Sequence, residues 1–152
     1  MVNSLIDHIL NPIEDYAGCK MTITSGLRTF QDYDRLIEQG YNPSKKSDHF
    51  FGLMPFTSGA ADMVYENGNQ FTIDLFYDLY KRYDKVRDRI IIPKADIQVG
   101  QMILEVKFDK NGIPSRWIHL SNPRRLFYSK DCPLPGQMFL RSDDNGKTYK
   151  ST

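Results

Sequence analysis

The chain contains few cysteines and few histidines. Its two cysteines, Cys19 and Cys132, do not form a Cys-x-x-Cys pair, and two are too few to build a disulfide scaffold. They are therefore either two separate thiols or one long-range disulfide, and the sequence leaves both open. Of the three histidines, His8 is expected to lie at the surface of the first helix, which leaves His49 and His119 for chemistry.

The chain also lacks a long apolar run and a large excess of either charge. No stretch of about 20 apolar residues could span a bilayer, and residues 1–5 do not resemble the basic start of a secretory signal. We therefore expect a protein made in the cytoplasm without a signal peptide and without membrane insertion. The net charge is +1 and the basic residues are scattered, so nucleic acid is not an expected partner.

The 152 residues are 40% apolar and 26% charged, which fits one domain over residues 1–152, and we expect a monomer. Apolar residues at helical spacing predict helices near the N-terminus and over residues 71–86, while alternating patterns predict strands at 101–108 and 115–121. These elements predict an α+β fold in which a small antiparallel sheet carries helices mainly on one side. The polar end, residues 142–152, is expected to be a flexible tail.

A segment rich in Gly, Pro, Ser and Asn, residues 41–59, separates two predicted elements. A loop of this length in a compact domain is usually functional or disordered. His49 lies within it, which favours a functional loop. The strand predicted to follow, residues 60–64, carries Asp62.

The Asp-Lys-Asn-Gly sequence at residues 109–112 predicts a turn between two strands. A loop of three or five residues centred on Gly112 would place Glu105 opposite His119, whereas a two-residue loop would place Leu104 there. The pattern does not choose between these registers. Glu105 is a carboxylate in a largely apolar strand, so it either faces solvent or is buried with a partner such as a cation or a metal-bound water.

Two histidines and one carboxylate are a common ligand set for zinc. His49, Asp62 and His119 could hold the metal, with a fourth position open for water. Glu105 could take a proton from that water and pass it to a leaving amine, and Arg28 could bind a substrate carboxylate or a developing oxyanion. The alternative is that both histidines and Asp62 are ordinary polar residues of a loop, a strand and a turn.

Four short motifs resemble those of the D-alanyl-D-alanine carboxypeptidase-like zinc peptidases, which share a fold with hedgehog signalling domains. Thr22–Arg28 resembles their T-I-T-S-G-Y-R, and Ser47–Gly52 resembles S-x-H-x-x-G. Gly59–Asp62 resembles G-x-A-x-D, and Trp117–Ser121 resembles W-[IV]-H-[VL]-S. The motifs occur in the family's order, and the resemblance runs from about Leu5 to Ser121, which is most of the chain.

The resemblance implies a zinc ion held by His49, Asp62 and His119. Arg28 would contact substrate, and Ser47 would contact substrate or support the ligands. Members of the family cleave peptidoglycan stem peptides as carboxypeptidases or as endopeptidases, and many are bacteriophage enzymes of the endolysin type. A protein of this kind made without a signal peptide would act on the cell wall when released or carried by a phage particle.

The sequence departs from the family pattern in two places. The first histidine and the aspartate are thirteen residues apart instead of seven, with residues 53–58 inserted between them. Arg116 occupies the position three residues before the last histidine, where many members carry the catalytic glutamate, and Glu105 is the substitute that the hairpin suggests. These departures leave a second hypothesis open, a non-catalytic module of the same fold that binds the cell wall or belongs to a phage particle. A third is an α+β domain without metal.

Overall fold

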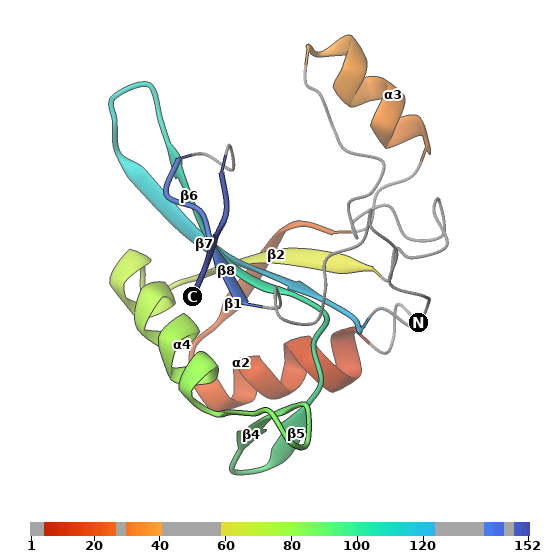
Figure 1. Ribbon diagram of the computed structural model, residues 1–152. Helices are drawn as coiled ribbons and strands as arrows, with labels where there is room; N and C mark the ends of the chain where they lie inside the picture. The colour runs from red at the N-terminus through yellow and green to blue at the C-terminus, as the bar shows by residue number, and fades with distance from the viewer. Residues whose placement is uncertain (1–4, 27–29, 41–58, 124–138, 145–147) are drawn as a thin grey trace.

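The computed structural model has mixed helices and strands, as an α+β fold requires, and so confirms the predicted fold class (Figure 1). The strands form a six-stranded sheet, in the order β1-β2-β7-β6-β8-β9, and a three-stranded sheet, in the order β3-β4-β5. The structure describes residues 5–26, 30–40, 59–123, 139–144 and 148–152.

The N-terminal helix has two parts that follow without a break. A turn of π-helix, η1 (Ile6–Leu10), leads into α2 (Asn11–Ala17). Pro12 lies at the start of α2, directly after the π-helical turn, and the helical run continues through it to Ala17. Gly18 terminates α2 with φ +62°, a left-handed conformation that glycine adopts without strain.

The large sheet is built from strands distant in sequence. Its members are β1 (Met21–Ser25), β2 (Ala60–Tyr65), β6 (Met102–Phe108), β7 (Pro114–Ser121), β8 (Phe139–Arg141) and β9 (Lys150–Ser151). Neighbouring strands are antiparallel except for β6 and β8, which are parallel. Residues on one face alternate with those on the other, so each strand contributes side chains both to the core and to the opposite face.

Helix α4 (Asn69–Lys81) packs against β2 and β7 and covers the apolar face of the large sheet. The core beneath it contains fully buried side chains from helices and strands, among them Ile13, Met63, Phe76, Met102, Leu104 and Ile118. Figure 1 shows α2 and α4 on this side and α3 (Phe30–Glu38) on the other side of the sheet. The opposite face of β2, β6 and β7 carries Asp62, Glu105 and His119.

Helix α4 is shorter than its apolar pattern predicts. The pattern continues to Val86, but the helix ends at Lys81, and Val86 is 96% exposed. The chain turns instead into the small sheet, whose strands are β3 (Tyr83–Asp84), β4 (Arg89–Ile92) and β5 (Ala95–Ile97). The carboxylate of Asp84 accepts hydrogen bonds from the backbone N–H groups of Val86 and Arg87, which favours a turn over continued helix.

The C-terminal segment contains a strand, although its polar sequence predicts a flexible tail. Leu140 and Arg141 of β8 pair with Ser151 and Lys150 of β9. The Thr152 backbone N–H also donates to the carbonyl of Phe139, at 3.1 Å. A polar strand of two residues has too short a pattern to be recognised in the sequence, and it is formed by pairing with β8.

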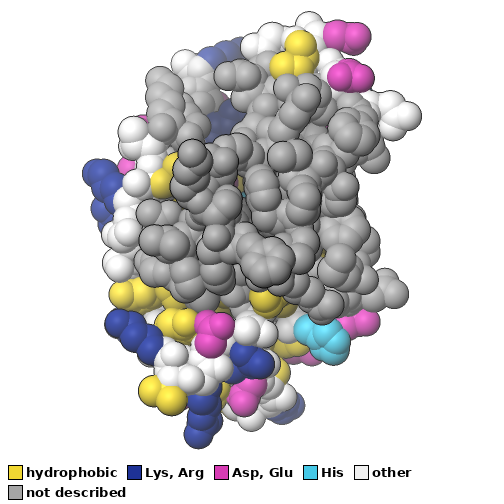
Figure 2. Space-filling model, turned by 45° about the vertical axis from the view of Figure 1, so that its right-hand side comes forward, with side chains coloured by type: hydrophobic (Ala, Val, Ile, Leu, Met, Phe, Trp, Pro, Cys, Tyr) yellow, Lys and Arg dark blue, Asp and Glu magenta, His cyan; other side chains and the backbone are white. Residues whose placement is uncertain are grey.

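The described helices include none that is both long and apolar enough to cross a membrane. Figure 2 shows one face of the molecule, and on its described part acidic and basic side chains are interspersed. Cys19 is buried and has a free thiol, whereas Cys132 lies outside the described residues.

Gly100 provides a test of how tightly the end of β7 is packed. Its backbone N–H donates to the carbonyl of Ser121 at 2.8 Å, and a Cβ at this position would lie 2.2 Å from the backbone oxygen of Asn122. We expect Gly100→Ala to reduce the free energy of unfolding by at least about 1–3 kcal/mol, because the backbone must move to relieve the overlap.

Denaturant unfolding of Gly100→Ala measures this loss, and Gly26→Ala is the matched control. Among the described residues, the atom nearest to a Cβ at Gly26 would be Ile23 Cγ2 at 3.9 Å, which is ordinary van der Waals contact. Equal stability of the two variants would contradict the close approach at Gly100.

Candidate functional site

Asp62 and His119 lie directly opposite each other on the adjacent antiparallel strands β2 and β7. Residues paired in this way project from the same face of a sheet. His119 Nδ1 is 3.0 Å from Asp62 Oδ1, and the two side chains are only 9% and 14% exposed. Residues separated by 57 positions in the chain therefore form one polar pair on the face opposite α4.

Glu105 lies on the same face, although in a different register from either predicted one. It pairs with Trp117, and Ile103 stands opposite His119. Both proposed pairings, Glu105 or Leu104 opposite His119, are therefore wrong. Because Trp117 and His119 are two residues apart, Glu105 occupies the diagonal position from the histidine, typically about 7–8 Å away.

Asp109 accounts for this register. The β6–β7 loop runs from Asp109 to Ile113 and is centred on Asn111 instead of Gly112. The Asp109 carboxylate accepts hydrogen bonds from the backbone N–H groups of Asn111 and Ile113, at 2.8 and 2.9 Å. Gly112 has φ +75°, and its N–H donates to the Asp109 carbonyl. These bonds close a five-residue loop and leave Phe108 and Pro114 as the first strand pair.

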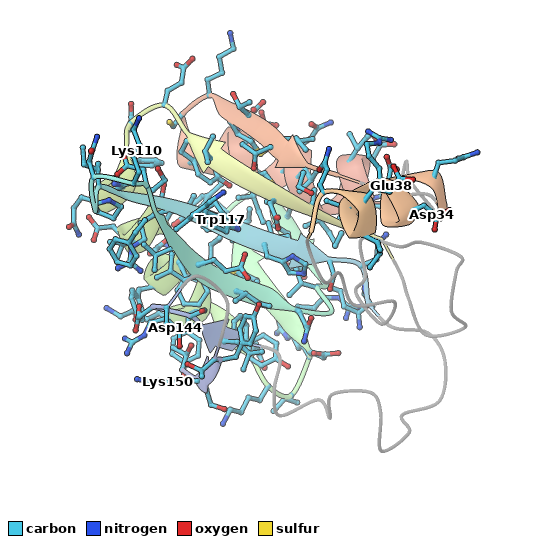
Figure 3. All side chains as sticks on the ribbon, turned by 90° about the horizontal axis from the view of Figure 1, so that it is seen from above. Asp34, Glu38, Lys110, Trp117, Asp144 and Lys150 are labelled. Carbon is cyan, nitrogen blue, oxygen red and sulfur yellow. The ribbon has the colours of Figure 1, made fainter. Side chains whose placement is uncertain are left out.

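The Glu105 carboxylate is held by two aromatic side chains. The Trp117 indole N–H donates to Oε2, and the Tyr149 hydroxyl donates to Oε1 at 3.2 Å. Figure 3, which looks onto this face of the sheet, shows Trp117 on β7, with Asp144 and Lys150 on one side of it and α3 on the other. Glu105 does not simply face solvent, as one sequence interpretation proposed, because both carboxylate oxygens have donors within the protein.

The surroundings of Glu105 shift the pKa of its carboxyl. Burial is the largest cause and raises the pKa of the carboxyl above its ordinary value. The charge of His119 and the hydrogen bonds from Trp117 and Tyr149 lower the pKa, while the charge of Asp62 raises it further. The strand pairing puts Asp62, His119 and Glu105 on one face of the sheet, and the charges of the first two act on the third.

This shift predicts a pH dependence of stability for the metal-free protein. A carboxyl whose pKa is raised on folding contributes stability below its unfolded-state pKa, about 4.3 for Glu, and loses it as the pH rises through the folded-state value. In the presence of a chelator, wild-type protein should therefore lose stability relative to Glu105→Gln as the pH rises from about 4 through the raised pKa. Thermal unfolding of both proteins over this range tests the sign, and a difference independent of pH would refute it.

Arg116 faces away from this site. Residues three apart on a strand project from opposite faces, so a side chain at position 116 cannot share the face of His119. The Arg116 guanidinium instead lies 3.4 Å from the Asp143 carboxylate, and its backbone N–H donates to the side chain of Asn69. In this strand geometry a base three residues before the histidine would be misplaced, whatever its residue type.

The remaining predicted site residues, Arg28, Ser47 and His49, lie outside the described residues, as does the 53–58 insertion. The structure thus brings Asp62, His119 and Glu105 together and leaves the other assignments as predictions.

The Asp62–His119 pair fits two ligands of one metal ion. Ligand atoms at about 2.0–2.1 Å from a tetrahedral zinc are about 3.3 Å apart, close to the 3.0 Å observed. The same distance also fits a hydrogen bond between the two side chains. Within the described part of the chain, no three His, Cys, Asp or Glu side chains group closely enough to hold a metal. His49, the third ligand that the sequence predicts, lies outside the described residues.

Tyr149 is the residue that sequence reasoning missed. It is the only aromatic residue in the polar stretch 142–152, and that isolation is the one local signal that could have marked it. Burial and the charge of Glu105 raise the pKa of the Tyr149 hydroxyl, so the hydroxyl remains a proton donor at neutral pH. The contact with Glu105 spans 44 positions in sequence and depends on how β9 is placed.

Comparison with known proteins finds no matching family model, no matching curated protein and no matching solved structure.

Proposed function

We propose that this chain is a zinc-dependent peptidase that hydrolyses peptidoglycan stem peptides. The observation that carries the proposal is the 3.0 Å approach of His119 Nδ1 to Asp62 Oδ1 on the face that also holds Glu105. These are the groups that metal-assisted hydrolysis requires, namely nitrogen and oxygen ligands with a further carboxylate nearby. The substrate class comes from the four motifs, which resemble those of cell-wall peptidases.

Each residue then has a defined task. His49, Asp62 and His119 would hold the zinc, which when bound would polarise the peptide carbonyl and lower the pKa of water to about 7. Glu105 accepts the proton released by the attacking water and delivers it to the leaving amine. Arg28 binds a carboxylate of the stem peptide or the developing oxyanion, and Ser47 contacts the substrate.

The hydrogen bonds to Glu105 also support a second candidate function. Trp117 and Tyr149 each donate to one oxygen of its carboxylate, so the buried charge is satisfied without a metal-bound water. A non-catalytic module that binds cell-wall peptides, including one carried in a phage particle, would need no metal-bound water beside Glu105. Such a module would bind the stem peptide and leave its bonds intact.

Mass spectrometry of muropeptides incubated with the zinc-loaded protein distinguishes the two functions. A peptidase yields products of defined mass that identify the cleaved bond, and excess chelator stops their formation. Intact muropeptides together with measurable binding would support the non-catalytic module. Intact muropeptides without binding, and no zinc retained after dialysis, would refute both.

A further inference from the structure

We propose that Tyr149, supplied by the C-terminal segment, is a positioning residue that fixes the orientation of the Glu105 carboxylate beside the Asp62–His119 pair. The inference extends the proposed function and depends on it. Its basis is the hydrogen bond of 3.2 Å from the Tyr149 hydroxyl to Glu105 Oε1, opposite the bond that Trp117 makes to Oε2.

The segment that carries Tyr149 is anchored on both sides of the residue. Before it, the Thr148 backbone N–H donates to the Asp144 carboxylate at 2.9 Å, and the Thr148 hydroxyl donates to the same group. After it, Lys150 pairs with Arg141 in the sheet. The C-terminal carbonyl of Thr152 accepts a hydrogen bond from Tyr80 of α4, at 3.2 Å. These bonds hold the backbone on both sides of Tyr149, and so they determine where its hydroxyl lies.

Two donors at different oxygens restrict the carboxylate more than one does. Trp117 alone would leave the glutamate free to rotate about its terminal torsion, which has a broad energy minimum. A donor at each oxygen selects one orientation of the carboxylate plane. Catalytic proton transfer depends on such an orientation, because small displacements of a reacting group reduce the rate strongly.

A purely stabilising role explains the contact less well. Tyr149 is 49% exposed, so burial of its ring contributes less to stability than burial of a core aromatic residue. Glu105, by contrast, is largely screened from solvent, and burial is the main influence on its pKa. The main effect of the hydrogen bond is therefore on the Glu105 carboxylate, which it satisfies and orients.

The test is Tyr149→Phe, which removes only the hydroxyl, compared with Tyr83→Phe as a matched control. Tyr83 also donates to a carboxylate, that of Asp88 at 2.6 Å, but in the small sheet away from the site. For Tyr149→Phe we expect kcat to fall about 10- to 100-fold with little change in KM, and zinc content to remain that of the wild type. Tyr83→Phe should retain the wild-type kcat.

A second measurement follows the contact without relying on turnover. The chain has one tryptophan, so the indole N–H of Trp117 gives a single resonance in ¹⁵N-labelled protein. We expect this resonance to shift in Tyr149→Phe and to stay in place in Tyr83→Phe, because the shared carboxylate changes orientation only in the former.

The outcomes separate the two proposals. Wild-type kcat in Tyr149→Phe, or an unmoved indole resonance, would overturn the positioning role while muropeptide hydrolysis by the wild type still supports the peptidase. Failure of the wild type itself to hydrolyse muropeptides would overturn the peptidase and with it the role of Tyr149.

Discussion

His119→Ala is expected to abolish zinc binding and muropeptide hydrolysis. The imidazole and the Asp62 carboxylate are placed to share a metal, with His119 Nδ1 3.0 Å from Asp62 Oδ1. Changes to residues that merely orient a ligand reduce metal affinity or activity by about 10- to 100-fold, so loss of a ligand should exceed that range. Zinc content after dialysis and the rate of product formation measure the two effects.

His8→Ala is the matched control, because His8 is exposed on η1 and has no part in the site. It should keep both zinc and activity. His119 is buried, so His119→Ala leaves a cavity that His8→Ala does not. Unfolding curves must therefore confirm that His119→Ala folds. A folded His119→Ala protein that still binds one zinc per chain would contradict the proposed ligand set.

Glu105→Gln is expected to reduce kcat by about 10²- to 10⁴-fold, the usual contribution of a general base. The amide keeps the shape of the side chain and can still accept the Trp117 hydrogen bond, but it cannot take up a proton. Zinc content should not change, since Glu105 is a diagonal neighbour of His119 and is not assigned as a ligand. Steady-state kinetics with a purified muropeptide measure the loss.

Glu66→Gln supplies the comparison for Glu105→Gln, because Glu66 is exposed just beyond β2. It should leave the kinetics unchanged. If Glu105→Gln hydrolyses muropeptides at the wild-type rate, the assignment of the base is wrong, although the metal site and the peptidase function would survive.

The fold class follows largely from local pattern. Alternation identified β6 and β7, and the apolar stripe identified α4, because these elements are long enough for their period to show. The pattern failed where another interaction determined the end of an element. Residues 83–86 continue the helical stripe of α4, but Asp84 accepts two backbone hydrogen bonds and turns the chain into the small sheet.

For the site, the motifs marked Asp62 and His119, and the apolar strand around it marked Glu105. How these three side chains are arranged depends on the register of the strands, which local patterns do not determine. A hairpin that differs by one residue in its register exchanges the two faces of a strand, and turn residues alone left the register open. The bonds that Asp109 makes within the β6–β7 loop determine the register, and they place Trp117, instead of His119, opposite Glu105.

The sequence by itself determined which residue types are available for chemistry and on which kind of element each lies. Only the tertiary structure decided that Asp62 and His119 touch and that Tyr149, from the polar end of the chain, reaches Glu105. The physical reason is that strand pairing joins segments far apart in sequence. The free energy that selects one pairing comes from burial and hydrogen bonding across the sheet as a whole, and no local pattern records it.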